Sequence, residues 1–219
     1  MKNDKATNVV AGLTIVASWA FLTSPYIAFP PGINRGSQQA LGQVLAEEAV
    51  KLLGNGGKIT VITRDTTTYK NPSTDAQLRG FRDTLKQARV TVASTIALPL
   101  NPISLVYAPP GDFLRTMKKL TDADVIVSFM GPAGLNETQI AALGEKRPKV
   151  VALCTGTMPQ RVNLKQLFDQ KLLHAVVLNR EHPLPGPPSS ETPRAWFERL
   201  YQLATPTNFV EAPLPDPRP

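Results

Sequence analysis

The chain has 219 residues, 42% of them hydrophobic and 19% charged, a balance that predicts one domain of ordinary size with its own core and excludes disorder throughout. Its formal net charge is +7, but the Lys and Arg residues are scattered and not interleaved with aromatics, so we expect a basic solvated surface and no nucleic-acid partner. The single cysteine, Cys154, excludes an internal disulfide and a multi-cysteine metal site.

The N-terminal region contains an uncharged apolar run, Val9 to Phe29, of 21 residues. As a helix, such a run is long enough to cross roughly 30 Å of hydrocarbon. Lys2 and Lys5 precede it, which favours an N-terminus in the cytoplasm and a body in the periplasm or another extracytoplasmic space. A cleaved signal peptide, with small residues at Ser18 to Ala20, is the alternative. We expect residues 1–30 to form a retained membrane anchor.

The stretch from Asn34 to Asp65 predicts a helix, a glycine-rich turn and a buried strand. Ser37 is the expected N-cap of the helix, and Gly54 stands where a helix stops. The β-branched run at 58–63 is typical of a strand in a parallel sheet. The apolar stripe of the helix consists of Leu41, Val44, Leu45, Ala49 and Leu52.

Helices and strands then alternate up to residue 180. Such alternation predicts a parallel sheet with helices on both faces, because crossover connections place them there. We therefore expect residues 31–180 to form a doubly wound α/β domain with one five-stranded parallel sheet in the order 2-1-3-4-5. Its strands are centred near residues 58–63, 91–97, 123–129, 149–154 and 174–179.

The composition changes after Arg180, because ten of the chain's 21 prolines lie between Pro183 and Pro219. We expect residues 181–219 to be a proline-rich tail with one short helix inside Thr192–Ala204. That helix needs a surface to cover its apolar face, on its own domain or on a partner. We expect the partner-binding residues to be Trp196, Phe197, Leu200, Tyr201 and Leu203.

The sequence carries no clear catalytic or metal site. His174 and His182 have no second ligand at metal spacing, so neither a metal nor a cofactor is expected. Doubly wound sheets bind ligands at the carboxyl ends of their strands, where the loop after the first strand offers polar groups. A solvated turn is the competing interpretation of that loop. The weak ligand-binding candidates along this edge are Asp65, Thr66, Thr67, Gly131 and Thr155.

The order of these elements resembles the second lobe of the type I periplasmic sugar-binding proteins. The resemblance covers about Asn34 to Asn179 and rests on the first helix–strand unit, "LRGF" at Leu78 to Phe81, "ADVIVSFMG" and "KVVALCTGT". It implies that two such lobes close on a ligand. Here a membrane segment occupies the place of the first lobe.

The resemblance also implies where ligand groups should stand in this lobe. The family's arginine falls on Asp75, its Asn-Asp pair falls near Gly131 and Pro132, and its aspartate falls near Cys154 or Thr155. These residues do not make the same polar contacts, so a small-molecule ligand is not expected, although Asp75 stays a weak candidate.

Two functions follow as expectations. The first is a non-enzymatic, membrane-anchored accessory subunit of a larger membrane complex, whose lobe is a scaffold and whose partners contact the anchor and the tail. The second is a membrane-tethered solute-binding or sensing module of a sugar transport system.

Overall fold

The structure, a computed structural model, describes residues 33–68, 70–99, 108–145, 147–185, 190 and 192–209. The predicted membrane segment, Val9 to Phe29, lies outside these residues. Within the part of the chain that is described, no helix is long and apolar enough to cross a membrane.

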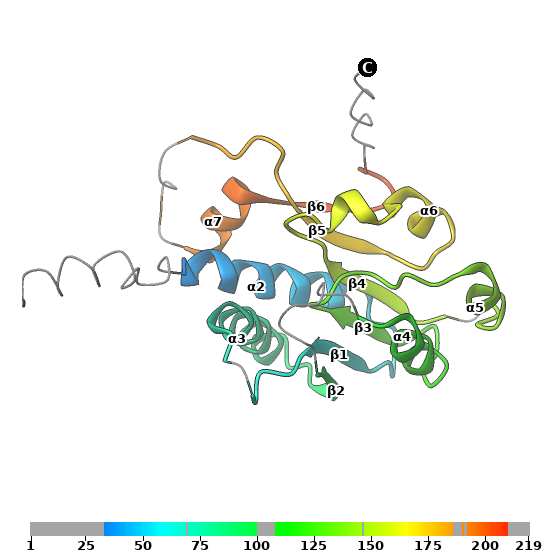
Figure 1. Cartoon of the computed structure of the whole chain (residues 1–219). Coiled ribbons are helices and arrows are strands. Elements are labelled where there is room, and N and C mark those ends of the chain that lie inside the picture. The colour runs from blue at the N-terminus through cyan, green and yellow to red at the C-terminus, as the bar shows by residue number, and fades with distance from the viewer. Residues whose placement is uncertain are drawn as a thin grey trace, which may run out of the picture. The chain divides into compact units, whose positions relative to one another are not determined.

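Helices and strands alternate along the chain, as predicted (Figure 1). The strands are β1 (Ile59–Arg64), β2 (Val92–Leu98), β3 (Val125–Ser128), β4 (Lys149–Leu153), β5 (Ala175–Asn179) and β6 (Tyr201–Ala204). The helices are α2 (Arg35–Leu52), α3 (Pro72–Gln87), α4 (Pro110–Met117), α5 (Glu137–Ala141), α6 (Leu164–Asp169) and α7 (Pro193–Leu200), with a 3₁₀ turn at Pro159–Arg161.

The strands form one sheet in the order β2-β1-β3-β4-β5-β6. Its first five strands are parallel and follow the predicted order, whereas β6 pairs antiparallel with β5. The prediction of five strands is therefore wrong by one. The expected helix over Thr192–Ala204 ends at Leu200, because Tyr201 turns to an extended backbone and its strand completes the edge of β5.

Alternating side chains of the strands build two cores, one on each face of the sheet. Val61, Val127 and Val151 face the first core, under α2, α3 and α7, whereas Ile126 and Val150 face the second, under α4 and α6. Helices on both faces are the doubly wound arrangement, and the near-continuous apolar strands follow from burial on both sides.

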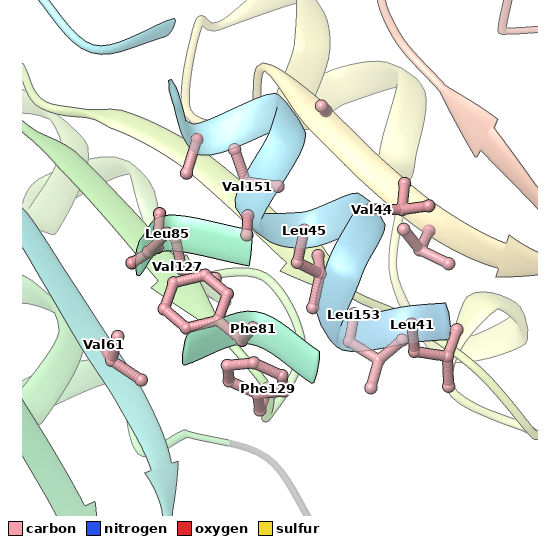
Figure 2. Packing of buried hydrophobic residues seen from close by; sticks show 14 of the residues in the cluster. Leu41, Val44, Leu45, Val61, Phe81, Leu85, Val127, Phe129, Val151 and Leu153 are labelled. Carbon is pink, nitrogen blue, oxygen red and sulfur yellow. The ribbon is translucent and has the colours of Figure 1, made fainter. Parts of the chain in front are cut away.

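Two glycines let α2 and α3 approach closely. A Cβ on Gly42 of α2 would lie 1.8 Å from the carbonyl oxygen of Gln77, and one on Gly80 of α3 would lie 2.2 Å from that of Gln39. Below this crossing, the rings of Phe81 and Phe129 meet edge to face with centroids 5.5 Å apart (Figure 2). Small residues at the crossing thus set the depth at which α3 packs over β1 and β3.

The C-terminal helix packs on its own domain. α7 lies against α2, on the side away from α3 (Figure 1). The prediction that Ser37 caps this helix is wrong, because α2 begins two residues earlier, at Arg35, and Ser37 is buried inside the helix. Its hydroxyl instead hydrogen-bonds with that of Tyr201. This contact joins the start of the domain to β6.

Candidate functional site

A small pocket lies at the carboxyl ends of β1, β3 and β4, beneath the first turns of α3. Its volume is about 230 Å³, so only a small solute fits inside. Its polar lining consists of Thr63, Arg64, Asn71, Ser73, Thr74, Gln77 and Thr155, and its apolar lining of Phe129, Met130, Leu153 and Met158. Arg64 is the only charged residue in this lining.

Thr63 supplies the pocket's most unusual group. It is the second-last residue of β1 and is 3% exposed, and its hydroxyl oxygen makes no hydrogen bond within the described part of the chain. A buried hydroxyl without a partner costs about 1–3 kcal/mol. Thr63 is one of the residues that line the pocket.

The N-terminus of α3 adds hydrogen-bond donors above Thr63. The side chain of Asn71 accepts the N–H of Thr74 at 3.1 Å, and the N–H of Asp75 donates to the Asn71 carbonyl. Pro72 has no N–H, and that of Ser73 has no partner among the residues described here. The partial positive charge at the start of a helix favours an acceptor or an anion at such a position.

Side-chain contacts fix the walls of the pocket. The amide of Gln77 donates to Gln38 on α2 at 2.7 Å, which holds its side chain across the two helices. The ring of Phe129 is packed against Phe81. Gly131 adopts φ +81°, and a Cβ there would lie 2.5 Å from the Met158 sulfur. Gly131 thereby leaves room for Met158, which lines the pocket.

The weak ligand-binding candidates fall in two groups. Thr155 lines the pocket, and Gly131 is buried behind its wall. Asp65, Thr66, Thr67 and Asp75 do not line it.

The first three of these belong to a solvated turn. The Asp65 carboxylate accepts the N–H of Thr67 at 2.8 Å. This hydrogen bond, with one from the Thr67 side chain, lowers the pKa of Asp65. Such a turn satisfies its own polar groups, which agrees with the competing interpretation of this loop.

The titratable residues that most resemble catalytic groups have structural roles. Burial raises the pKa of the Cys154 thiol to about 12, so it is protonated at neutral pH. His174 lies at the opposite, amino end of the sheet, where its Nδ1 accepts the N–H of Val150 at 3.2 Å. Burial lowers the pKa of His174, and Lys149 and Lys171 lower it further.

Asp124 joins β1 and β3 at that same amino end. Its carboxylate accepts the N–H of Lys58 at 2.7 Å and both the N–H and the hydroxyl of Thr121. Burial alone would raise the pKa of this carboxyl group, but these hydrogen bonds lower it overall.

The five residues expected to bind a partner are covered to different degrees by their own domain. Phe197 and Tyr201 are buried in the first core, and Trp196, Leu200 and Leu203 are half-buried against it. Of the two surfaces expected to cover the apolar face of this helix, the chain's own domain is therefore the one that α7 packs against. Phe197 and Tyr201 are not available as a surface.

The sequence did not single out Thr63, Arg64, Ser73 or Gln77. Thr63 sits within a run of strand residues, and its missing hydrogen bond is visible only in three dimensions. A usable signal was the position of Thr63 and Arg64 at the end of the first strand, together with the Asn-Pro-Ser start of the next helix.

Comparison with known proteins gives fold neighbours only. No protein-family model matches the chain, and no curated protein sequence matches it. An arabinose-binding protein from Geobacillus stearothermophilus is 18% identical with a TM-score of 0.45, over 64% of this chain and 45% of its own. A sugar-binding protein of a Bacillus halodurans transporter is 12% identical with a TM-score of 0.49. The match covers 78% of this chain and 62% of that protein.

A third neighbour is a carbohydrate-transporter solute-binding protein from Agrobacterium radiobacter, whose structure was solved in complex with D-arabinose. It is 13% identical with a TM-score of 0.48, and the match covers 78% of this chain and 60% of that protein. The chain spans about half the length of the first of these proteins. Type I periplasmic sugar-binding proteins are thus among its structural neighbours. With TM-scores below 0.5, none of them decides what this chain binds.

Proposed function

We propose that this chain is a non-enzymatic solute-binding module whose pocket at the carboxyl edge of the sheet takes a small polyhydroxylated anion, such as a sugar acid. The observation that carries the proposal is the buried, unpartnered hydroxyl of Thr63 inside a polar pocket. A hydroxyl that costs stability without a ligand is explained if a ligand completes its hydrogen bond.

The charge of the lining selects the class of solute. Arg64 and the N-terminus of α3 both favour negative charge, and no carboxylate lines the pocket to repel it. The remaining groups, hydroxyls and amides of Thr63, Ser73, Gln77 and Thr155, suit a solute with several hydroxyls. A sugar acid combines both features at a size suited to about 230 Å³.

The test compares D-galacturonate with D-galactose, which differ in one carboxylate, by calorimetric titration of the full-length chain. Galacturonate should bind and galactose should bind at least about tenfold more weakly, because only the acid meets Arg64 and the helix terminus. Arg64→Gln should reduce this preference, and the N-terminus of α3 should keep a part of it. Asp83→Asn, an exposed change further along α3 and outside the pocket, should leave both affinities unchanged.

Thr63→Val separates binding from folding. The valine keeps the shape of the side chain and removes the orphan hydroxyl, so the free energy of unfolding should rise by about 1 kcal/mol while galacturonate binding falls. A variant that is less stable, or that binds as well as the wild type, would show that the hydroxyl has no part in a ligand site.

We also propose, as a second function, that the module is held at the extracytoplasmic face of a membrane by Val9 to Phe29 as an accessory subunit of a larger complex. The uncharged run motivates the anchor. The edge strand β2, which pairs only with β1 among the described residues, offers a surface for a partner. Co-purification in mild detergent tests it. A stoichiometric set of membrane proteins supports the accessory role, and a chain released without detergent contradicts it.

A further inference from the structure

The strand β2 lies at one edge of the described sheet. Within the described residues, β2 pairs only with β1. The carbonyl of Leu98 accepts the N–H of Asp65 at 2.9 Å, so the peptide group of Leu98 faces the β1 side. Backbone polar groups alternate along a strand, and those of Thr95 and Ala97 therefore point away from β1. An edge with free N–H and C=O groups is a template for another strand.

A groove of about 460 Å³ runs beside this edge, between β2 and α3. Figure 1 shows the helix and the strand next to one another at the end of the sheet. The inner wall includes Val61, Phe81 and Leu85, which point toward one another in Figure 2. The groove is thus apolar within and bordered by a strand edge. It shares no lining residue with the solute pocket.

Every charged residue that lines the groove is a cation: Arg82, Lys86 and Arg89. All three are exposed, and none belongs to an ion pair that the structure describes. A second copy of this chain, paired edge to edge, would bring these cations together. The positive charge of the groove therefore disfavours a second copy and complements an acidic segment of another protein.

Arg89 is held in a conformation that glycine adopts more readily. It lies just after the end of α3 and has φ +56°. The backbone N–H of Arg89 donates to the carbonyl of Lys86, and the backbone N–H of Val90 donates to the carbonyl of Leu85. A positive φ is costly for a side chain other than glycine. Lys171 has the same conformation, φ +54°, after α6 and outside the groove. It offers a matched control.

From the β2 edge, the apolar groove and its three cations, we infer that an acidic, extended segment of a partner protein binds along β2 as an added strand. Main-chain hydrogen bonds to Thr95 and Ala97 supply the pairing, apolar side chains of the segment enter the groove, and its carboxylates meet Arg82, Lys86 and Arg89. The inference goes beyond solute binding and gives the proposed accessory role a surface.

The probe is a labelled nine-residue peptide, Val-Thr-Glu-Thr-Val-Thr-Glu-Thr-Val, whose valines and glutamates share one face of a strand. It is titrated with the full-length chain by fluorescence anisotropy at low and high salt. It should bind, and binding should weaken as salt rises. The same peptide with lysine in place of each glutamate should not bind. Arg82→Glu with Lys86→Glu should lower the affinity for the glutamate peptide on the order of tenfold or more.

Two further variants separate docking from folding. Arg89→Gly relieves the strained backbone and removes the guanidinium, so the melting temperature should not fall while the affinity does; Lys171→Gly should leave the affinity unchanged. Thr95→Pro removes an N–H at the β2 edge, where proline is tolerated, and should abolish binding in a folded chain.

Equal binding of the lysine peptide, or undiminished binding by Thr95→Pro or by the glutamate pair, would overturn the inference. So would a failure of the wild type to bind the glutamate peptide. Membrane proteins that still co-purify with the non-binding variants would show that the accessory role stands without this groove.

Discussion

His174 shows how a titratable side chain acts as part of the framework. It precedes β5, its N–H donates to the Val150 carbonyl at 2.8 Å, and its ring accepts the Val150 N–H. Only a ring nitrogen without a proton accepts that bond. Burial first, and then Lys149 and Lys171, lower the pKa of this residue from 6.5, so the folded state holds it neutral.

This neutral state makes stability depend on pH. Below pH 6.5 the unfolded chain takes up a proton that folded His174 resists until the pH falls to its lowered pKa. The stability that neutral His174 contributes to the folded state is therefore fully present above pH 6.5. It is lost progressively as the pH falls from 6.5 to the lowered pKa of folded His174, and the loss stops below that pKa.

His174→Asn, which keeps an acceptor for Val150 without titrating, should flatten the pH dependence. Denaturant unfolding of both proteins at pH 7.5 and pH 5.5 measures the effect. An equal loss of stability in the variant and the wild type over that window would contradict the assignment.

At the scale of elements, the packing of α2 on α3 depends on the absence of side chains. The helices are tied by the hydrogen bond between Gln77 and Gln38, and their backbones meet at Gly42 and Gly80. Alanine is the better helix former by about 1 kcal/mol. At this crossing the cost of steric overlap exceeds that gain in helix propensity, because the added methyl group would overlap a backbone oxygen that cannot rotate away.

Gly42→Ala should therefore lower the free energy of unfolding by about 2 kcal/mol or more. Gly111→Ala is the matched control, since Gly111 lies within α4 and a Cβ there meets nothing within 4 Å. It should be neutral or stabilising by about 0.5 kcal/mol. Chemical denaturation of the two variants gives both values. A Gly42→Ala protein as stable as the wild type would mean that the helices have room to separate.

The C-terminal elements complete the sheet, so they should be required for folding. Truncation after Arg180 removes the buried side chains of Phe197 and Tyr201 and exposes the edge of β5. Each such side chain contributes about 1.5–3 kcal/mol, which together is comparable with the whole stability of a small domain. The truncated chain should show no cooperative melting transition.

Truncation after Phe209 is the control for that experiment. It keeps all six strands of the described sheet, so its melting curve should match that of the full chain. If the chain ending at Arg180 melts cooperatively near the temperature of the full chain, α7 and β6 are only attached to a domain that is complete without them.

How far the sequence predicts this structure differs between elements. The five parallel strands are β-branched runs bounded by turns, so their number and positions followed from local pattern. Their order was expected from the doubly wound fold class. The strand β6 did not, because Trp196, Leu200 and Leu203 continue at helical spacing through it. Pairing with β5, distant in sequence, overrides that local preference.

The same contrast holds for the site. That polar groups gather at the carboxyl ends of the strands followed from the topology alone. Which groups face a pocket depends on the depth at which α3 packs, and that depth is set by Gly42 and Gly80. The sequence therefore indicated Thr155 but not Thr63, whose buried hydroxyl without a partner is visible only in three dimensions.

At the scale of the whole molecule, the sheet separates two surfaces with different chemistry. The carboxyl edge carries the small polar pocket beneath the N-terminus of α3, and the β2 edge carries an apolar groove with basic residues. Both involve α3, at its beginning and at its end. A net charge of +7 favours anions at either surface.

The central claim, that the carboxyl-edge pocket is a solute site, is tested most directly by mapping where a solute binds. The measurement is a titration of the ¹⁵N-labelled full-length chain with D-galacturonate, followed by the backbone amide NMR signals. We predict saturable shifts at Ser73, Thr74, Gln77 and Thr155, which need about tenfold or more higher concentrations of D-galactose and are weakened in Thr63→Val. No saturable shift, or shifts confined to residues outside this pocket, would contradict the claim.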